Sequence, residues 1–172
     1  MNVDEISFRM ALIEGLHLAG LVDELTLVIA AADEAPDPAI DRLTPAPYPD
    51  DPAAAAEFAT ATRDDLLDRR TADAAVVRRA LEMFVDPGED DEGENEDQPD
   101  QIEITIRRAE IDAWLRTLTA LRLIIATRLG ITTADDDHDP DDARFGVYDW
   151  LAYRLGSLIA IADALDEIPD DV

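Results

Sequence analysis

Apolar residues recur at steps of three and four along several stretches of the chain, the spacing that places side chains on one face of an α-helix. The first stretch, 6–32, predicts a long N-terminal helix. Its expected inner stripe consists of Ile6, Met10, Ile13, His17, Leu21, Leu25 and Val28. The same period returns over 111–129, where Gly130 suits a left-handed helix end, and again over 148–165. We expect 111–129 to be the central helix.

Two further segments lie between the first and the central helix. Six prolines between 34 and 52 predict a loop, with at most one turn at 39–43, because each proline fixes its own φ and disfavours helix in the residue before it. A short Ala-rich helix should then begin after Asp51 and close near Thr62. Since threonine is a good helix cap, we expect a separate helix from Thr62 to Val85.

Ile102, Ile104 and Ile106 alternate with polar residues, which is the period of a half-buried strand. One strand needs a partner, which the rest of the pattern scarcely offers, so this segment either pairs weakly or leads into the next helix. The whole pattern predicts a mainly all-α protein with one helical domain over 1–172. We expect a bundle of about four to five helices, with room for one short strand or hairpin near 102–106.

Carboxylates gather in two segments that interrupt the helices. Residues 86–101 include nine carboxylates, two prolines and two glycines but no apolar side chain, so we predict a disordered acidic loop. Residues 133–142 are predicted to form an acidic turn. The run from Asp135 matches a calcium-binding loop in composition only, because Pro140 takes the glycine position and Gly146 that of the last glutamate. No metal site is therefore expected.

The chain of 172 residues has a net charge of −27, from 41 acidic residues and 14 arginines with no lysine. Such a charge repels nucleic-acid phosphates and anionic lipids, so direct nucleic-acid or membrane binding is not expected. The longest apolar run, 27–32, is far shorter than the about 20 residues that span a bilayer, and the N-terminus has no basic leader. We expect a cytoplasmic protein. A GC-rich genome and adaptation to high salt both remain explanations of the acidity.

Catalytic chemistry has few candidate residues here. The absence of cysteine removes thiol nucleophiles, thiolate metal ligands and thiol redox sensing. His17 and His138 are the two histidines, and no serine or threonine lies in a nucleophile elbow or glycine-rich turn. We predict a protein that is not an enzyme, needs no cofactor and acts by binding another macromolecule.

One segment departs from the general acidity, since residues 102–130 carry five arginines and three acids. Arg122 borders the apolar stripe, where it forms either an internal ion pair with a carboxylate such as Asp149 or part of an Arg-and-aromatic contact surface. The candidate protein-binding residues are Trp114, Arg116, Arg122, Arg128, Tyr148, Asp149 and Trp150. Arg116→Glu should weaken partner capture and leave the fold intact.

Three parts of the chain resemble one family. They read Tyr48-Pro-Asp-Asp-Pro-x4-Glu57-Phe58 with Thr62-x-Asp-Asp-Leu66, then Trp114-Leu-Arg-x-Leu118-x2-Leu121-Arg-Leu123-x3-Thr127-Arg-Leu-Gly130, and last Tyr148-Asp-Trp-Leu151. In this order they are similar to the actinobacterial domain-of-unknown-function family that includes AosR, the actinomycete oxidative stress regulator.

The resemblance implies a helical, non-enzymatic regulator that acts by protein contact in transcription and oxidative-stress regulation, through a sigma factor or RNA polymerase. The family's common gene neighbourhood with the ClpS protease adaptor leaves an adaptor in Clp-dependent proteolysis as one alternative. A homodimeric structural protein that buries the Trp114 and Trp150 helices is another. Two departures stand out: members often have a strand before the first helix, which the periodicity does not predict here, and a chain without cysteine cannot use a thiol switch.

Overall fold

The computed structural model describes residues 5–45, 50–84, 101–133, 139 and 141–166. These residues form a mainly helical domain with one small sheet, which confirms the predicted fold class. The elements are β1 (Glu5–Ala11), α1 (Leu12–Ala30), α2 (Pro38–Leu43), α3 (Pro52–Ala80), β2 (Gln101–Arg107), α4 (Ile111–Leu129) and α5 (Gly146–Asp166). Short 3-10 turns lie at Leu81–Met83, Arg108–Glu110 and Ala143–Phe145.

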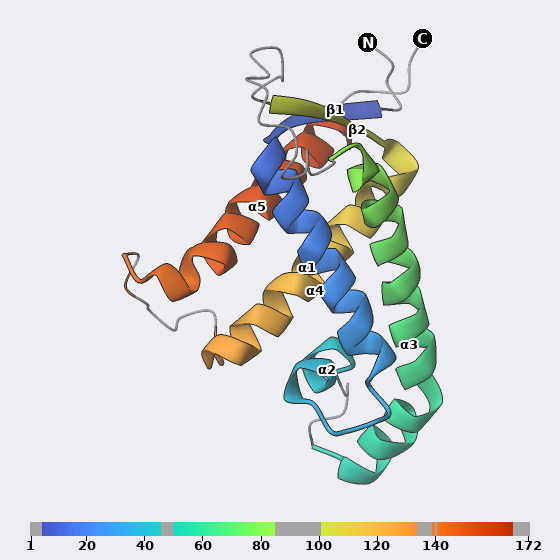
Figure 1. Ribbon diagram of the computed structural model, residues 1–172. Coiled ribbons are helices and arrows are strands. Elements are labelled where there is room, and N and C mark those ends of the chain that lie inside the picture. The colour runs from blue at the N-terminus through green and yellow to red at the C-terminus, as the bar shows by residue number, and fades with distance from the viewer. Residues whose placement is uncertain (1–4, 46–49, 85–100, 134–138, 140, 167–172) are drawn as a thin grey trace.

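Helix α4 is the centre of the bundle, as its long apolar stripe predicted. It packs against α1, α2, α3 and α5. In Figure 1, α1 crosses in front of α4, with α3 on one side and α5 on the other, and the sheet covers one end of the bundle. Gly130 ends α4 with a φ of 78°, the left-handed conformation that favours glycine.

The strand predicted near 102–106 has a partner that the periodicity did not reveal. β1 and β2 pair antiparallel, with Ile6 opposite Ile106, Phe8 opposite Ile104 and Met10 opposite Ile102. The prediction of helix over 6–11 is therefore wrong. Apolar residues at 6 and 10 fit a helix, but those at 6, 8 and 10 fit a strand equally well. The strand forms because it buries the face that carries these three residues against the helices.

The inner face of α1 also differs from the predicted stripe. The residues that it buries are Gly15, Leu18, Ala19, Val22, Leu25 and Ile29. Ile13 and His17, which were placed on the inner stripe, are exposed, Ile13 by 72%. Because α1 carries apolar residues on most of its surface, a three-and-four spacing can be drawn along more than one face. β1 also supplies the strand before the first helix whose absence was taken as a departure from the family.

Helix α3 is continuous, so the predicted break at Thr62 is wrong. The Asp51 side chain caps its start by accepting hydrogen bonds from the amides of Ala53 (3.1 Å) and Ala54 (3.0 Å). The Thr62 hydroxyl instead donates to the Phe58 carbonyl (2.9 Å), as a threonine inside a helix does. The turn expected at 39–43 is present as α2.

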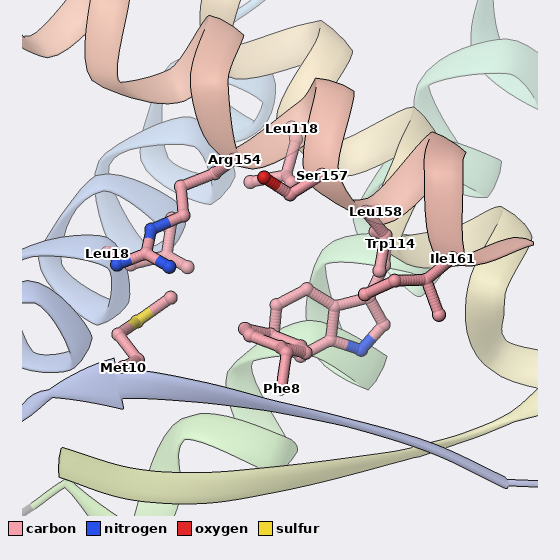
Figure 2. Close-up of a pocket in the computed structure, with 9 residues that line it drawn as sticks. All are labelled: Phe8, Met10, Leu18, Trp114, Leu118, Arg154, Ser157, Leu158 and Ile161. Carbon is pink, nitrogen blue, oxygen red and sulfur yellow. The ribbon is translucent and has the colours of Figure 1, made fainter.

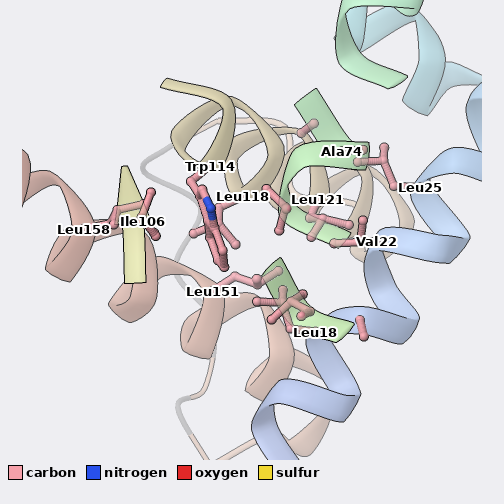
Figure 3. Packing of buried hydrophobic residues seen from close by; sticks show 14 of the residues in the cluster. Leu18, Val22, Leu25, Ala74, Ile106, Trp114, Leu118, Leu121, Leu151 and Leu158 are labelled. Carbon is pink, nitrogen blue, oxygen red and sulfur yellow. The ribbon is translucent and has the colours of Figure 1, made fainter. Parts of the chain in front are cut away.

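One apolar cluster joins all the long elements. Its members include Leu18 and Val22 of α1, Ile106 of β2, Trp114 of α4 and Leu151 of α5, which Figure 3 shows packed together. Trp114 is its largest buried side chain and is 1% exposed. The described residues therefore share a single core.

Most of the two predicted acidic segments lies outside the described residues. This applies to 86–100 and to 134–138 with 140, whereas Gln101 belongs to β2. Within the described part of the chain, none of the helices combines the length and the apolar character needed to cross a membrane.

Candidate functional site

Trp114, the first of the predicted contact residues, is a core residue. Its ring meets the Phe8 ring edge-on, with 5.5 Å between centroids and an interplanar angle of 88°. Since it is buried within its own chain, its indole is not part of an exposed contact surface.

Arg116 joins α4 to α3 through an ion pair with Asp73. Its Nε and a terminal nitrogen donate to the two carboxylate oxygens, at 2.7 and 3.1 Å, and Asp73 is 8% exposed. The hydrogen bonds that Arg116 donates to Asp73 raise the pKa of Arg116 further above its usual value. Because Arg116→Glu would set a second carboxylate against a buried one, we now expect it to destabilise the fold, in place of the intact fold that the sequence led us to expect.

Arg128 has a similar structural role at the other end of α4. Its two terminal nitrogens donate to both carboxylate oxygens of Asp37, at 2.9 and 2.6 Å, and Asp37 also caps α2 through the Ala39 amide. The hydrogen bonds from Arg128 and from that amide lower the pKa of Asp37. This pair fixes the start of α2 on α4.

Arg122 and Tyr148 are the two predicted residues that the structure does bring together. The guanidinium carbon of Arg122 lies 4.3 Å from the centroid of the Tyr148 ring. This cation–π contact, rather than the expected ion pair with Asp149, is the contact that Arg122 makes in the described part of the chain. Asp149 and Trp150 follow on α5 and are half-buried. The seven predicted residues thus do not share one face.

An open groove between α1 and α5 involves one of these residues, Trp150. We call it the α1–α5 groove; it has a volume of about 240 Å³. It is lined by Ile13, Glu14 and His17 of α1 and by Gly146, Val147 and Trp150 of α5. Ile13 and His17 are four residues apart, as are Gly146 and Trp150, so each helix contributes one face.

The Glu14 carboxylate holds Trp150 in place at the groove. It accepts a hydrogen bond from the indole nitrogen of Trp150 (2.7 Å), one from Arg154 and one from the Ala11 amide at the start of α1 (3.0 Å). Burial raises the pKa of Glu14, but the hydrogen bonds from Arg154, Trp150 and Ala11 together lower it below its usual value. The His17 ring stands edge-on to Trp150, at 6.2 Å between centroids. These contacts fix the orientation of the Trp150 ring.

Arg154 also borders a small interior cavity, which Figure 2 shows between the sheet, α1, α4 and α5. The cavity measures about 40 Å³, which is room for a few water-sized molecules and not for an organic ligand. Its walls are mostly apolar, with Phe8, Met10 and Trp114 among them. We assign it to the packing of the core.

The described residues offer no candidate metal centre. No group of three or more histidine, aspartate or glutamate side chains lies close enough there to hold a metal ion. Ser157, the serine nearest the Arg154 network, donates its hydroxyl to the Tyr153 carbonyl (2.9 Å). The features that stand out are an oriented tryptophan and an exposed isoleucine.

The family comparison covers almost the whole of this architecture. The family model named Domain of unknown function (DUF2017) matches residues 2–162, from before β1 into α5. The chain belongs to the DUF2017 family. No curated protein and no solved structure matches it.

Sequence reasoning found one residue of the α1–α5 groove of this DUF2017 chain, Trp150, and missed the rest. Ile13 and His17 were placed on the inner stripe of α1 because that stripe was drawn along the wrong face. The pairing of Glu14 with Arg154 gave no signal, since the two are 140 residues apart and one glutamate does not stand out in a chain with 41 acidic residues. Glu14 three residues after the helix cap was the available clue, because that position can receive an amide hydrogen bond.

Proposed function

We propose that this DUF2017 protein is a non-enzymatic cytoplasmic regulator that acts by protein–protein contact, and that the α1–α5 groove is its contact surface. The observation that carries the proposal is Trp150. Its indole nitrogen is already hydrogen-bonded to Glu14, so the ring can offer an apolar face without an unsatisfied donor. Tryptophans held in this way are typical anchors of protein interfaces, because little rotamer entropy remains to be lost on binding.

The shape of the groove suits an apolar side chain of a partner helix. Its walls come from two helices, its volume is about 240 Å³, and Ile13, 72% exposed, stands at its edge. A partner helix that inserts one or two large aliphatic residues would bury Ile13, Val147 and the Trp150 ring together. Burial of these surfaces would supply the affinity.

The charge of the chain points to the kind of partner. A net charge of −27 favours encounter with basic surfaces and disfavours acidic ones. Proteins that bind nucleic acid present such surfaces, and the resemblance to AosR supports a sigma factor or RNA polymerase, in transcription or oxidative-stress regulation in an actinobacterium. Because the chain has no cysteine, control by a thiol switch is not part of the proposal.

The test is affinity capture with two matched variants of α1. Ile13→Glu places a charge in the α1–α5 groove, and Leu27→Glu makes the same type of change at a residue of similar exposure, 72% against 69%. The two positions are 14 residues apart on one helix, which is about 21 Å. We expect wild type and Leu27→Glu to capture a sigma factor or RNA polymerase, identified by mass spectrometry, and Ile13→Glu to lose it.

Other outcomes decide against the proposal in different ways. Equal capture by wild type and Ile13→Glu would show that the partner binds elsewhere on the protein. Capture of a Clp chaperone in place of the transcription machinery would favour the adaptor alternative. Light scattering that shows a dimer dissociated by Ile13→Glu would assign the groove to a second copy of the chain.

A further inference from the structure

A second pocket lies between α2, α4 and α5. It has a volume of about 200 Å³. Arg42 of α2 and Arg122 of α4 line it together with Tyr148 of α5, while Leu123 and Leu155 give it an apolar wall. None of these residues lines the α1–α5 groove, so the two sites can be tested separately.

The two arginines differ from most others in the chain. Eight arginines form ion pairs with described carboxylates: Arg63, Arg78, Arg79, Arg107, Arg116, Arg128, Arg144 and Arg154. For Arg42 and Arg122 the described part of the chain supplies no carboxylate partner. In a protein with 41 acidic and 14 basic residues, two such cations in one pocket are unexpected. Among the described residues, they give this pocket a local positive charge.

Neighbouring groups hold both guanidinium groups in place. One terminal nitrogen of Arg42 donates to the Ile131 carbonyl (2.8 Å) and to the Thr127 hydroxyl (3.4 Å). Arg122 lies over the Tyr148 ring at 4.3 Å, and its Nε is buried without a hydrogen-bond partner among the described residues. A guanidinium has five N–H donors, so each arginine retains donors that these contacts do not use.

We propose that this pocket binds a small amphiphilic anion, with an oxyanion head between Arg42 and Arg122 and an aliphatic body against Leu123 and Leu155. Arginine donors in a fixed fork match the geometry of carboxylate and phosphate oxygens. The negative charge of the whole chain opposes the binding of anions at long range. At an ionic strength near 0.15 M this repulsion is screened within about 8 Å, so the two nearby arginines dominate inside the pocket.

The test uses three probes that separate the head from the body. Octanoate carries both parts, octanol carries the body alone, and inorganic phosphate carries an anionic head alone. In calorimetric titrations of the full chain at 0.15 M salt, we expect octanoate to bind at least about tenfold more tightly than either of the others. Failure of octanoate to bind, or equal binding of octanol, would overturn the proposal.

Two substitutions at the pocket rim test the location of the site. Thr119 lines the pocket and is exposed, and its hydroxyl already donates to the Leu115 carbonyl within its own helix. Thr119→Glu adds a carboxylate beside the arginines, whereas Thr119→Gln adds the same bulk without charge. We expect Thr119→Glu to weaken octanoate binding at least about tenfold and Thr119→Gln to change it less than about threefold.

Equal affinity of the two Thr119 variants for octanoate would contradict the assignment, once circular dichroism shows that both are folded. Ile13→Glu serves as the control for the separate α1–α5 groove and should leave octanoate affinity unchanged. Loss of partner capture by Ile13→Glu together with failure of octanoate to bind would refute the anion site and leave the proposed function standing.

Discussion

Gly15 of α1 lies directly against the Phe84 ring, and this close approach needs the absence of a side chain. A Cβ atom there would stand 2.0 Å from the ring carbon Cδ1 of Phe84, which is itself buried. We predict that Gly15→Ala lowers the free energy of unfolding by about 1–3 kcal/mol, the usual effect of overpacking a core. Urea denaturation measures this change.

Gly20 provides the control for that prediction. It lies in the same helix, and a Cβ atom there would meet nothing within 4 Å. Gly20→Ala should therefore raise the free energy of unfolding by about 0.5–1 kcal/mol, because alanine loses less backbone entropy in a helix. Equal effects of the two substitutions would contradict the packing of Phe84 on α1.

The Glu14 carboxylate gives a prediction about pH. Its pKa is lowered in the folded protein, so it stabilises the fold above its usual pKa and loses this contribution as the pH falls through its folded value. Glu14→Gln should lower the free energy of unfolding by about 1–2 kcal/mol at pH 7, where it removes charged hydrogen bonds. The difference from wild type should shrink between about pH 5 and pH 3.

Measuring both proteins at each pH is necessary, because protonation of the many other carboxylates changes the stability of both. Urea denaturation at pH 7, 5, 4 and 3 provides the comparison. A difference between wild type and Glu14→Gln that stays constant over this range would show that the charge of Glu14 does not stabilise the fold.

At the scale of elements, ion pairs connect α4 to its neighbours, and the Asp73–Arg116 pair can be tested alone. Arg116→Ala leaves the Asp73 carboxylate, 8% exposed, without this partner. We expect it to lower the free energy of unfolding by about 1–3 kcal/mol. The control is the exposed Arg69, which lies on α3 like Asp73. Arg69→Ala should change the free energy of unfolding by less than about 0.5 kcal/mol.

A double-variant cycle separates the ion pair from other effects of the substitutions. If the two side chains interact, the double variant Asp73→Ala, Arg116→Ala should lose less free energy of unfolding than the sum of the losses in the two single variants. Full additivity in urea denaturation would contradict a direct interaction between α3 and α4 at this point.

The elements themselves were predictable to different degrees. The bounds of α4 and its glycine cap follow from one clear stripe and one glycine, and the structure confirms both. β1 could not be predicted with the same certainty, because Ile6, Phe8 and Met10 satisfy two periods and the partner strand lies some 90 residues later in the chain. Local patterns do not report such distant pairing.

The same limit explains why sequence reasoning found so little of the candidate site. The sequence identified α4 as a basic helix, but whether an arginine serves the fold or a partner depends on which carboxylate lies opposite. Asp73 of α3 occupies that position for Arg116, and Asp37, the residue before α2, occupies it for Arg128. A groove formed by α1 and α5 likewise depends on packing between segments more than 130 residues apart.

At the scale of the whole molecule, the net charge of −27 has a direct consequence for stability. Repulsion among the carboxylates opposes the compact state, and salt screens it. We predict that the urea midpoint rises as sodium chloride is increased from about 10 to about 300 mM. A midpoint that falls over this range would mean that the ion pairs outweigh the repulsion.

The α1–α5 groove as the partner-binding surface is the central claim, and the absence of cysteine allows a direct test of it. A photoreactive group attached to the single cysteine of Ile13→Cys probes the groove, and the same group on Leu27→Cys probes the far end of α1. After irradiation in native lysate, we expect a cross-link from position 13 to a sigma factor or an RNA polymerase subunit, and none from position 27. Equal cross-linking of that protein from both positions, or its absence from position 13, would contradict the account.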